Sequence, residues 1–398
     1  MANFNSPEGD IAQIYLSDTE ILERYVGNQL WGWGYNKEGQ LGTNNLVHRS
    51  SPVQTVAGGT NWKQVSGGTS EASITAAIKT DGTLWVWGSG SQGIQGTNST
   101  TNKSSPVQTV AGGTNWKQVS VGADHVASIK TDGTLWVWGR STNGRLGTNN
   151  AIDRSSPVQT VAGGTNWKQV SAGKASNTAA IKTDGTLWIW GSNVNGQLGT
   201  NDSVLVHRSS PVQTVAGGTN WKQVSVGSGH TTAIKTDGTL WIWGSNLNGQ
   251  LGTNDVVNRS SPTQIGANTN WKQVSAGFDL TTAIKTDGTL WVWGRGTNGI
   301  LGTNDQVYRS SPVQTVAGGT NWKQVSIAND DTNSIDIMIA AIKTDGTLWV
   351  WGSNTTGALG TNDLVHRSSP VQTIAGGTNW KQVSGGNFNT TAITYTES

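Results

Sequence analysis

Apolar and polar residues alternate in short runs along the chain, separated by stretches rich in glycine, asparagine and threonine. Between residues 167 and 215, for example, four such runs indicate strands, at residues 167–171, 178–182, 186–190 and 211–215. Asp184-Gly185 joins the second and third runs, and this dipeptide favours a tight hairpin because it readily takes positive φ values. Pro211 is expected to begin the fourth strand, which suits an edge position because proline has no N–H to donate.

This pattern recurs around the whole chain. NWKQVS occurs seven times and IKTDGTLW six times. The first Trp of a W-x-W-G unit stands at positions 31, 85, 136, 188, 241, 291 and 349. The third strand is apolar on both faces and must therefore be covered on both. Four short antiparallel strands, repeated seven times at about 50 residues, predict an all-β, seven-bladed β-propeller whose blades pack on each other.

The two ends of the chain favour a closed ring over a β-solenoid. Residues 30–34 form a return strand with no hairpin partner before it, and residues 390–394 form an outgoing strand with no return. Joining them completes the seventh blade, with Ile393 beside the run 30–33. A solenoid would need polar caps instead. We therefore assign residues 29–398 to the propeller and residues 1–28 to an N-terminal extension.

Composition narrows the range of functions. The chain has 398 residues, of which 13% are charged, with a formal net charge of +2 and no cysteine. Disulfides and thiolate sites are thereby excluded. No stretch approaches the roughly 18 apolar residues of a membrane span, and the start lacks a secretory signal, so we expect a cytosolic protein. With 24 acidic against 26 basic residues, the overall field is too weak to predict nucleic-acid binding.

The motif W-G-x-x-x-x-G-Q-L-G, followed by S-S-P-V, resembles the regulator of chromosome condensation repeat. It begins at Trp33, Trp190 and Trp243, and the resemblance covers residues 29–398. The resemblance implies a seven-bladed propeller. The eukaryotic member of that family is a chromatin-bound exchange factor for a small GTPase, but no long inter-blade insertion stands out here as an exchange wedge. The T-D-G-T-L-W-x-W-G hairpins are closer in texture to repeat-rich propellers of bacteria and bacteriophages, which implies a scaffold or adhesion role.

We expect no enzyme, cofactor or metal. Two G-x-G-x-x-G matches, at Gly88 and Gly294, are followed by loop and not by helix, so a dinucleotide site is not predicted. The Thr-Asp-Gly aspartates are turn residues. Turns are also expected, with calcium loops as the alternative, at Asp202, Asp255, Asp305 and Asp363. The five histidines fall on different blades, and no Ser-His-Asp arrangement stands apart from the repeat.

One cationic position recurs in every repeat, just before Ser-Ser-Pro. Its occupants are Arg49, Lys103, Arg154, Arg208, Arg259, Arg309 and Arg367. Seven cations at equivalent positions predict a ring on the propeller. In one interpretation, each cation bonds to loop carbonyls or to an aspartate of its own or a neighbouring blade. In the other, the ring is a surface for an anionic partner, such as an acidic glycan, a phosphate or an acidic protein.

Binding is expected where the copies differ, because loops carry function while the fold keeps the other positions nearly identical. The sixth repeat inserts residues 327–339, and the first has a smaller insertion at 69–75. The loops after W-G also vary, at 35–38, 140–143 and 353–356. The candidate interaction residues of the large insertion are Asp330, Asp331, Ile335, Ile337 and Met338. The alternative is simple drift in exposed loops.

The first 28 residues lack the repeat. Ser17-Asp-Thr-Glu20 is a capping-box pattern that predicts a short helix over 18–25, with candidate contact residues Ile21, Leu22 and Tyr25. Such a helix is too short to be stable alone. It therefore either covers one mouth of the propeller or docks on a partner.

These features predict a non-enzymatic assembly or adhesion module with a protein partner. The main prediction, which comes from the resemblance, is a bacteriophage virion protein of the tail or capsid surface, assembled in the host cytoplasm and anchored by residues 1–28. One alternative is an intracellular protein-interaction propeller that acts on a GTPase or another partner in the cytoplasm. The other is a lectin that binds a glycan through the variable loops. Nucleic-acid partners and membrane spans are not expected.

Overall fold

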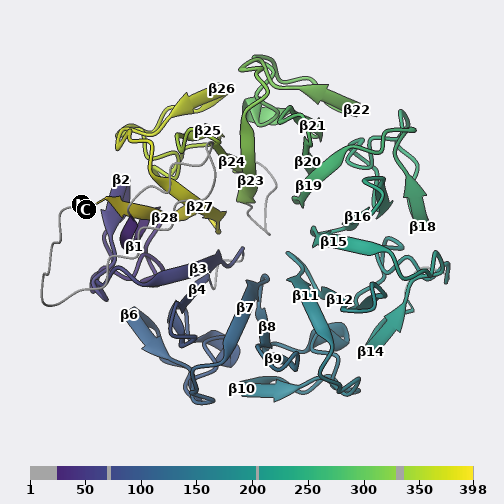
Figure 1. Ribbon diagram of the computed structural model, residues 1–398, viewed down its shortest axis with the longest axis horizontal. Helices are drawn as coiled ribbons and strands as arrows, with labels where there is room; N and C mark the ends of the chain where they lie inside the picture. Colours follow the sequence, from purple (N-terminus) through teal and green to yellow (C-terminus); the bar gives the residue numbers. More distant parts are fainter. Residues whose placement is uncertain (1–24, 70–72, 203–205, 329–335, 398) are drawn as a thin grey trace, which may run out of the picture.

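The computed structural model describes residues 25–69, 73–202, 206–328 and 336–397. Within these residues, the strands form seven four-stranded antiparallel sheets arranged as blades around a central axis (Figure 1). The strand of each blade that contains NWKQVS lies nearest the axis, and the strand that contains Ser-Ser-Pro lies at the rim. The predicted seven-bladed propeller is confirmed.

Blades 1 to 6 each consist of four consecutive strands. Blade 1 contains β3 (Trp62–Gly67), β4 (Ile74–Lys79), β5 (Leu84–Gly88) and β6 (Lys103–Gln108). Blade 2 contains β7 (Trp116–Val121), β8 (His125–Lys130), β9 (Leu135–Gly139) and β10 (Arg154–Gln159). Blade 3 contains β11 (Trp167–Ala172), β12 (Asn177–Lys182), β13 (Leu187–Gly191) and β14 (Arg208–Gln213).

The second half of the ring repeats this order. Blade 4 contains β15 (Trp221–Val226), β16 (His230–Lys235), β17 (Leu240–Gly244) and β18 (Arg259–Gln264). Blade 5 contains β19 (Trp271–Ala276), β20 (Leu280–Lys285), β21 (Leu290–Gly294) and β22 (Arg309–Gln314). Blade 6 contains β23 (Trp322–Ala328), β24 (Met338–Lys343), β25 (Leu348–Gly352) and β26 (Arg367–Gln372). Three 3-10 turns follow the third strands of blades 1, 2 and 5, as η1 (Ser91–Gly93), η2 (Thr142–Gly144) and η3 (Thr297–Gly299).

Blade 7 is built from both ends of the described chain. It contains β27 (Trp380–Gly385), β28 (Asn389–Glu397), β1 (Tyr25–Gly34) and β2 (Arg49–Gln54). Leu30 pairs with Ile393, as predicted. The propeller begins four residues earlier than expected, however, because β1 starts at Tyr25 and pairs there with Glu397. Tyr25, predicted as the end of a helix, therefore belongs to a strand, and the rest of that predicted helix lies outside the described residues.

The fourth strands also start earlier than predicted. In blade 3, β14 begins at Arg208, which pairs with Gly191, and not at Pro211. Pro211 lies at the register shift between the pairs Gly191–Arg208 and Ile189–Val212. The strand is at the edge of its sheet, where a proline can be tolerated because no further strand needs its missing N–H.

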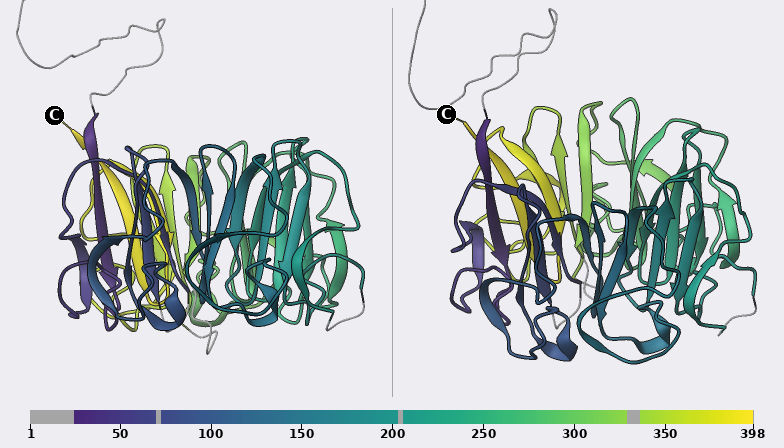
Figure 2. Two further views of the ribbon diagram at one scale, coloured as in Figure 1. Left: turned by 90° about the horizontal axis from the view of Figure 1, so that it is seen from below. Right: turned by 60° about the horizontal axis from the view of Figure 1, so that its bottom comes forward.

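The strand directions divide the propeller into two faces (Figure 2). One carries the Asp-Gly turns, the start of β1 and the end of β28, and we call it the turn face. The other carries the loops after W-G and the 3-10 turns, and we call it the loop face. The loop face is at the bottom of both views in Figure 2, and the end of β28 is at the top.

Glutamines of NWKQVS connect the inner strands around the ring. In each blade the side-chain amide donates to a backbone carbonyl of the next inner strand, and its oxygen accepts the N–H of that same residue. The seven pairs are Gln64–Val119, Gln118–Val170, Gln169–Val224, Gln223–Val274, Gln273–Val325, Gln324–Val383 and Gln382–Val65. The motif is therefore repeated because every blade junction needs it.

Tryptophans fill the spaces between blades. In blade 4, Trp221 and Trp243 are fully buried and pack on Ile181 and Ile189 of blade 3. Trp243 Nε1 donates to the carbonyl of Gln197 in blade 3 at 2.9 Å, so its polar group is also satisfied across the junction. These indoles belong to the scaffold and are not a stacking surface for a ligand.

Candidate partner-binding face

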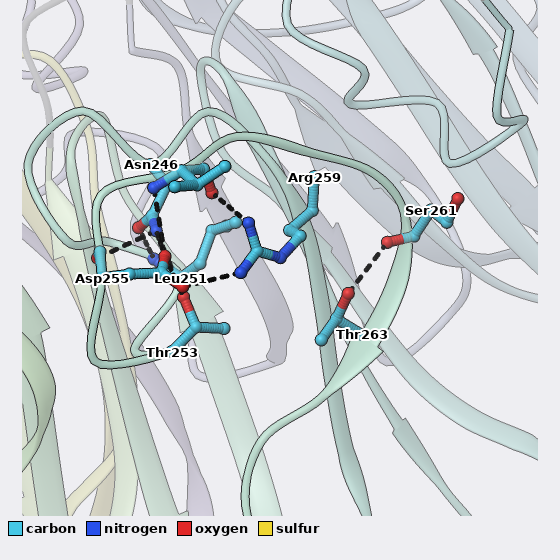
Figure 3. Close-up of polar contacts among 8 residues, drawn as sticks. Asn246, Leu251, Thr253, Asp255, Arg259, Ser261 and Thr263 are labelled. Carbon is cyan, nitrogen blue, oxygen red and sulfur yellow. Dashed lines mark hydrogen bonds and ion pairs between the residues drawn. The ribbon is translucent and has the colours of Figure 1, made fainter.

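The predicted ring of cations lies at the rim, and four of its members are paired. In Figure 3, Arg259 reaches Asp255 of its own loop, with Nη2 2.6 Å from Oδ2. The other carboxylate oxygen, Oδ1, accepts from Asn246, Thr253 and the N–H of Val257. The hydrogen bond from the N–H of Val257, followed by the bond from Thr253 and the charge of Arg259, lowers the pKa of Asp255. The equivalent pairs are Arg208–Asp202, Arg309–Asp305 and Arg367–Asp363.

These contacts bear on whether the four aspartates form turns or bind calcium. Asp255, Asp305 and Asp363 each accept the N–H two residues further on and also pair with an arginine, so the turn role is confirmed for these three. The calcium alternative does not fit these positions, because their carboxylates are already engaged. In these four blades the contacts match the first interpretation, in which each arginine pairs with an aspartate of its own blade.

The remaining three cations of the ring differ from these four. The position four residues before Arg49 and Arg154 is asparagine, and before Lys103 it is Ser99. Asn150 makes turn bonds like those of Asp255, to Thr148 and to the N–H of Ile152, but carries no charge. Among the described residues, no carboxylate lies within 4.0 Å of these three cations. They are on consecutive blades, 7, 1 and 2.

A cavity of about 310 Å³ opens on the loop face near the axis. Loops of four blades line it, and the residues that matter chemically are Asp124, Arg140, Arg145, Lys174, Ser176, Ser228 and Phe278. Such a volume is at the lower end of ligand pockets, which span about 300 to 1,000 Å³. It is large enough for one side chain of a partner or for a small ion.

Both the backbone and the side chain of Arg145 are fixed by hydrogen bonds. Its carbonyl accepts from Trp190 Nε1 and Thr178 Oγ1, both at 2.8 Å and both from blade 3. Its side chain is almost fully buried, and Nη2 donates to Ser176 Oγ at 2.6 Å. Burial lowers the pKa of Arg145, while the charge of Asp124 acts in the opposite direction. The guanidinium is therefore a fixed cation at the wall of the cavity.

Arg140 and Arg145 share one carboxylate. Asp124 Oδ2 lies 3.4 Å from Nη1 of each arginine. Both distances exceed the 2.7 to 2.9 Å typical of strong charge-assisted hydrogen bonds. The side chain of Arg140 is 42% exposed and lines the cavity, so it can be reached from solvent.

Lys174 adds a further basic group. Its Nζ donates to the carbonyl of Ile327 in blade 6 at 2.7 Å, which places the side chain across the central axis from its own blade 3. Burial lowers the pKa of Lys174 to about 7. The charge of this group is therefore sensitive to its surroundings near neutral pH.

Of the candidate interaction residues in the large insertion, the structure describes two. Ile337 and Met338 are 0% and 2% exposed, and both pack in the blade core, because the insertion ends at the start of β24. Their prediction as interaction residues is wrong. Asp330, Asp331 and Ile335 lie outside the described residues, as do Ile21 and Leu22 of the N-terminal extension.

The loop 140–143 was one of three variable loops predicted after W-G, whereas Arg145 and Lys174 were not among the predicted residues. Arg145 takes the position of Gln40, Gln197 and Gln250 in other repeats, and Lys174 that of Ala123 and Ser228. The signal was a charge at positions that other copies fill with neutral residues. Aligning the seven copies column by column would have found both residues.

The described residues were also compared with what a metal site and a membrane span require. Among the described residues, no three or more histidine, aspartate or glutamate side chains form a group that could hold a metal ion. In the same part of the chain, no helix has the length and apolar character needed to cross a membrane.

The fold and its repeat define a propeller of W-x-W-G blades closed by strands from both ends. The family model of the RCC1-like domain matches residues 8–332, and that of the regulator of chromosome condensation (RCC1) repeat matches residues 345–393. The chain therefore belongs to the RCC1-like propeller family.

Individual relatives cover parts of this chain. It is 32% identical over 260 residues to the ultraviolet-B receptor UVR8 of Arabidopsis thaliana. This alignment covers 65% of this chain and 58% of UVR8. The chain is 28% identical over 264 residues to the mitochondrial RCC1 domain-containing protein RUG3 of the same plant, with 61% and 55% covered. The chain thus spans less than two thirds of the length of either relative.

Solved structures support the fold. Prp20p of Saccharomyces cerevisiae superposes with a TM-score of 0.77 at 18% identity, covering 94% of this chain and 93% of that one. Human WBSCR16 superposes with a TM-score of 0.76 at 19% identity, covering 93% and 99%. The Prp20p structure is described together with the binding of that protein to Gsp1p and histones. The names of these relatives mention neither a virion nor a glycan, so the bacteriophage prediction has no support among them.

Proposed function

We propose that this chain is a non-enzymatic protein-interaction propeller that binds its partner on the loop face. One observation carries the proposal. Arg145, Lys174 and Phe278, which differ from the residues at the equivalent positions of the other blades, line one cavity on that face although they come from three different blades. Arg140, whose equivalent in blade 5 is also arginine, lines the same cavity. Drift at scattered loops would not be expected to converge in this way.

Two relatives support the proposal that this propeller binds a protein. Prp20p is described by its binding to proteins, and HERC2 of Homo sapiens, an E3 ubiquitin-protein ligase, matches this chain over only 5% of its own length. A propeller that forms a small part of a larger ligase is consistent with a recognition module. The rigid ring presents loops without needing them to form the core, which is the usual arrangement of a binding scaffold.

Site-specific photo-crosslinking tests the proposal. A crosslinking amino acid is placed at Thr142, which is exposed beside the cavity, and in a matched variant at Lys272, which is exposed on the turn face. In cells that produce the chain, we expect discrete protein adducts from position 142 and none from position 272. Adducts from position 272 alone, or no protein adduct together with binding on a glycan array, would reject the proposal, and the array result would favour the lectin.

A further inference from the structure

We propose that the loop face recognises an acidic peptide segment of its partner. One carboxylate enters the cavity between Arg140 and Arg145, and the peptide continues over the rim of blades 2, 1 and 7. This inference rests on the proposed function and specifies the chemistry of the partner.

The cavity offers donors that the protein itself leaves underused. Asp124 Oδ2 lies 3.4 Å from Nη1 of both guanidinium groups. Arg145 also donates from Nε to the carbonyl of Thr142 and from Nη2 to Ser176 Oγ, whereas Arg140, with five N–H donors in a planar fork, uses one of them on Asp124. Ser228 Oγ, which lines the same cavity, is buried and has no hydrogen-bond partner. An additional carboxylate would accept from these groups without displacing the existing contacts.

The charge balance matches a monoanion. Arg140 and Arg145 carry two positive charges, and Asp124 supplies one negative charge. One further carboxylate would neutralise the trio, whereas a phosphate dianion would overcompensate it. Lys174, whose pKa lies near neutrality because of burial, could bind a proton to accommodate additional negative charge.

The rim argues for an extended partner and against an isolated small ion. Arg154 pairs across the strands with Gly139, the residue before Arg140, so the cavity and the rim meet in blade 2. Beyond Arg154, the rim continues to Lys103 and Arg49, which lack the aspartate that neutralises the equivalent arginine in blades 3 to 6.

Acidic groups on the same side do not cancel this field. Asp153 accepts from the N–H of Ser141 at 2.7 Å, and Glu38 accepts from Asn102. Among the described residues of these loops, Asp124, Asp153 and Glu38 set three negative charges against the six positive charges of Lys37, Arg49, Lys103, Arg140, Arg145 and Arg154. One side of the loop face is therefore positive, while the four paired blades are close to neutral.

Calorimetric titration with hexaglutamate and, separately, with inorganic phosphate tests the inference on the full chain. We expect Arg140→Gln and Arg154→Gln each to weaken hexaglutamate binding by roughly tenfold, because each removes a charged hydrogen-bond donor. Arg140 is partly exposed, so this substitution should leave the fold intact. The affinity of the unaltered protein should fall as salt is raised.

Two variants serve as matched controls. Arg295→Gln removes the equivalent of Arg140 in blade 5, which pairs with Asp279 at 3.6 Å but does not line the cavity. Lys272→Gln removes one of the exposed lysines of NWKQVS on the turn face. Both should bind hexaglutamate as the unaltered chain does. Equal losses in these controls, or no loss in the two test variants, would overturn the inference.

A gain of binding is also expected. Asp202→Asn converts blade 3 to the neutral form seen in blades 2 and 7 and frees Arg208 beside the positive side. Binding should tighten several-fold, and unchanged or weaker binding would count against the inference.

Phosphate binding at least as tight as that of hexaglutamate would show a small-ion site and reject the peptide. If hexaglutamate fails while position 142 still crosslinks to a protein, the proposed function stands and only its acidic specificity is wrong.

Discussion

A glutamine side chain carries one amide donor group and one acceptor, which match the N–H and C=O of a single residue on a neighbouring strand. Gln223 uses both on Val274, at 3.2 Å each. Inner strands of adjacent blades are therefore connected by side chains, although they belong to different sheets. Replacing Gln223 leaves a backbone N–H and a C=O without these partners.

We expect Gln223→Ala to lower the free energy of unfolding by about 1 to 3 kcal/mol, the range for leaving a partly buried hydrogen-bonding group unsatisfied. Gln264 is the control, because it is exposed and only contacts the nearby carbonyl of Gly266. Gln264→Ala should change stability by less than about 0.5 kcal/mol. Urea unfolding followed by tryptophan fluorescence measures both, and equal effects would contradict the bridging role.

His230 should make stability depend on pH. Its ring is buried, and Nε2 lies 2.9 Å from Thr281 Oγ1, which itself donates to the carbonyl of Gln250. Burial, assisted by the charge of Lys174, lowers the pKa of His230 to about 3 from 6.5. The unfolded chain therefore binds a proton more readily, so this contribution is complete above pH 6.5 and is lost as the pH falls toward 3.

The loss attributed to His230 is on the order of 1.4 kcal/mol per pH unit within that window. Asparagine occupies the equivalent position as Asn177 and Asn389, so His230→Asn is a substitution that other blades already tolerate. Its unfolding free energy should fall less steeply between pH 6 and pH 4 than that of the unaltered chain. Identical slopes in denaturant titrations at these pH values would show that His230 does not bind a proton on unfolding.

At the scale of elements, blade 7 depends on one strand pair. β1 and β28 pair from Tyr25–Glu397 to Gly34–Asn389 and hold the two ends of the ring together. The described part of this ladder therefore already includes residues 25–28, which the sequence analysis assigned to the extension.

Two truncations test this boundary. Removing residues 1–24 should leave the thermal unfolding midpoint within a few degrees of the full chain, because the ladder is intact. Removing residues 1–30 deletes the pairs of Asn28, Gln29 and Leu30 with β28 and should lower the midpoint strongly. Circular dichroism melts of both proteins distinguish the outcomes. A comparable loss from the shorter truncation would mean that the first 24 residues stabilise the propeller.

The elements that could be predicted from the sequence are those with a local cause. Asp-Gly turns, alternating strands and their seven copies predicted the blades, and the incomplete ends predicted Leu30 beside Ile393. The start of β14 at Arg208 was missed because a bulged register, and not a residue preference, extends the strand beyond Pro211. The cavity was missed because Arg145 and Lys174 come together only when blades 2 and 3 are placed side by side.

At the scale of the whole molecule, the break in the chain replaces one of seven equivalent turns. The start of β1 and the end of β28 occupy the place where the other blades have an Asp-Gly hairpin. A circular permutant opened between Asp184 and Gly185, with residues 25 and 397 joined by a short linker, should therefore fold. We expect a single unfolding transition and a native-like tryptophan spectrum. Two separate transitions would mean that the closing blade is not equivalent to the others.

The closing strand pair also sets the timing of biosynthesis. Trp31 and Thr394, which share a 3.0 Å hydrogen bond in blade 7, are 363 positions apart. At roughly 5 to 20 residues per second, the ribosome needs about 20 to 70 s to make the chain between them. During that interval β1 has left the ribosome while the strand that it pairs with does not yet exist. A nascent chain therefore carries an unsatisfied strand edge until β28 has been made, and in this period we expect it to depend most on chaperones.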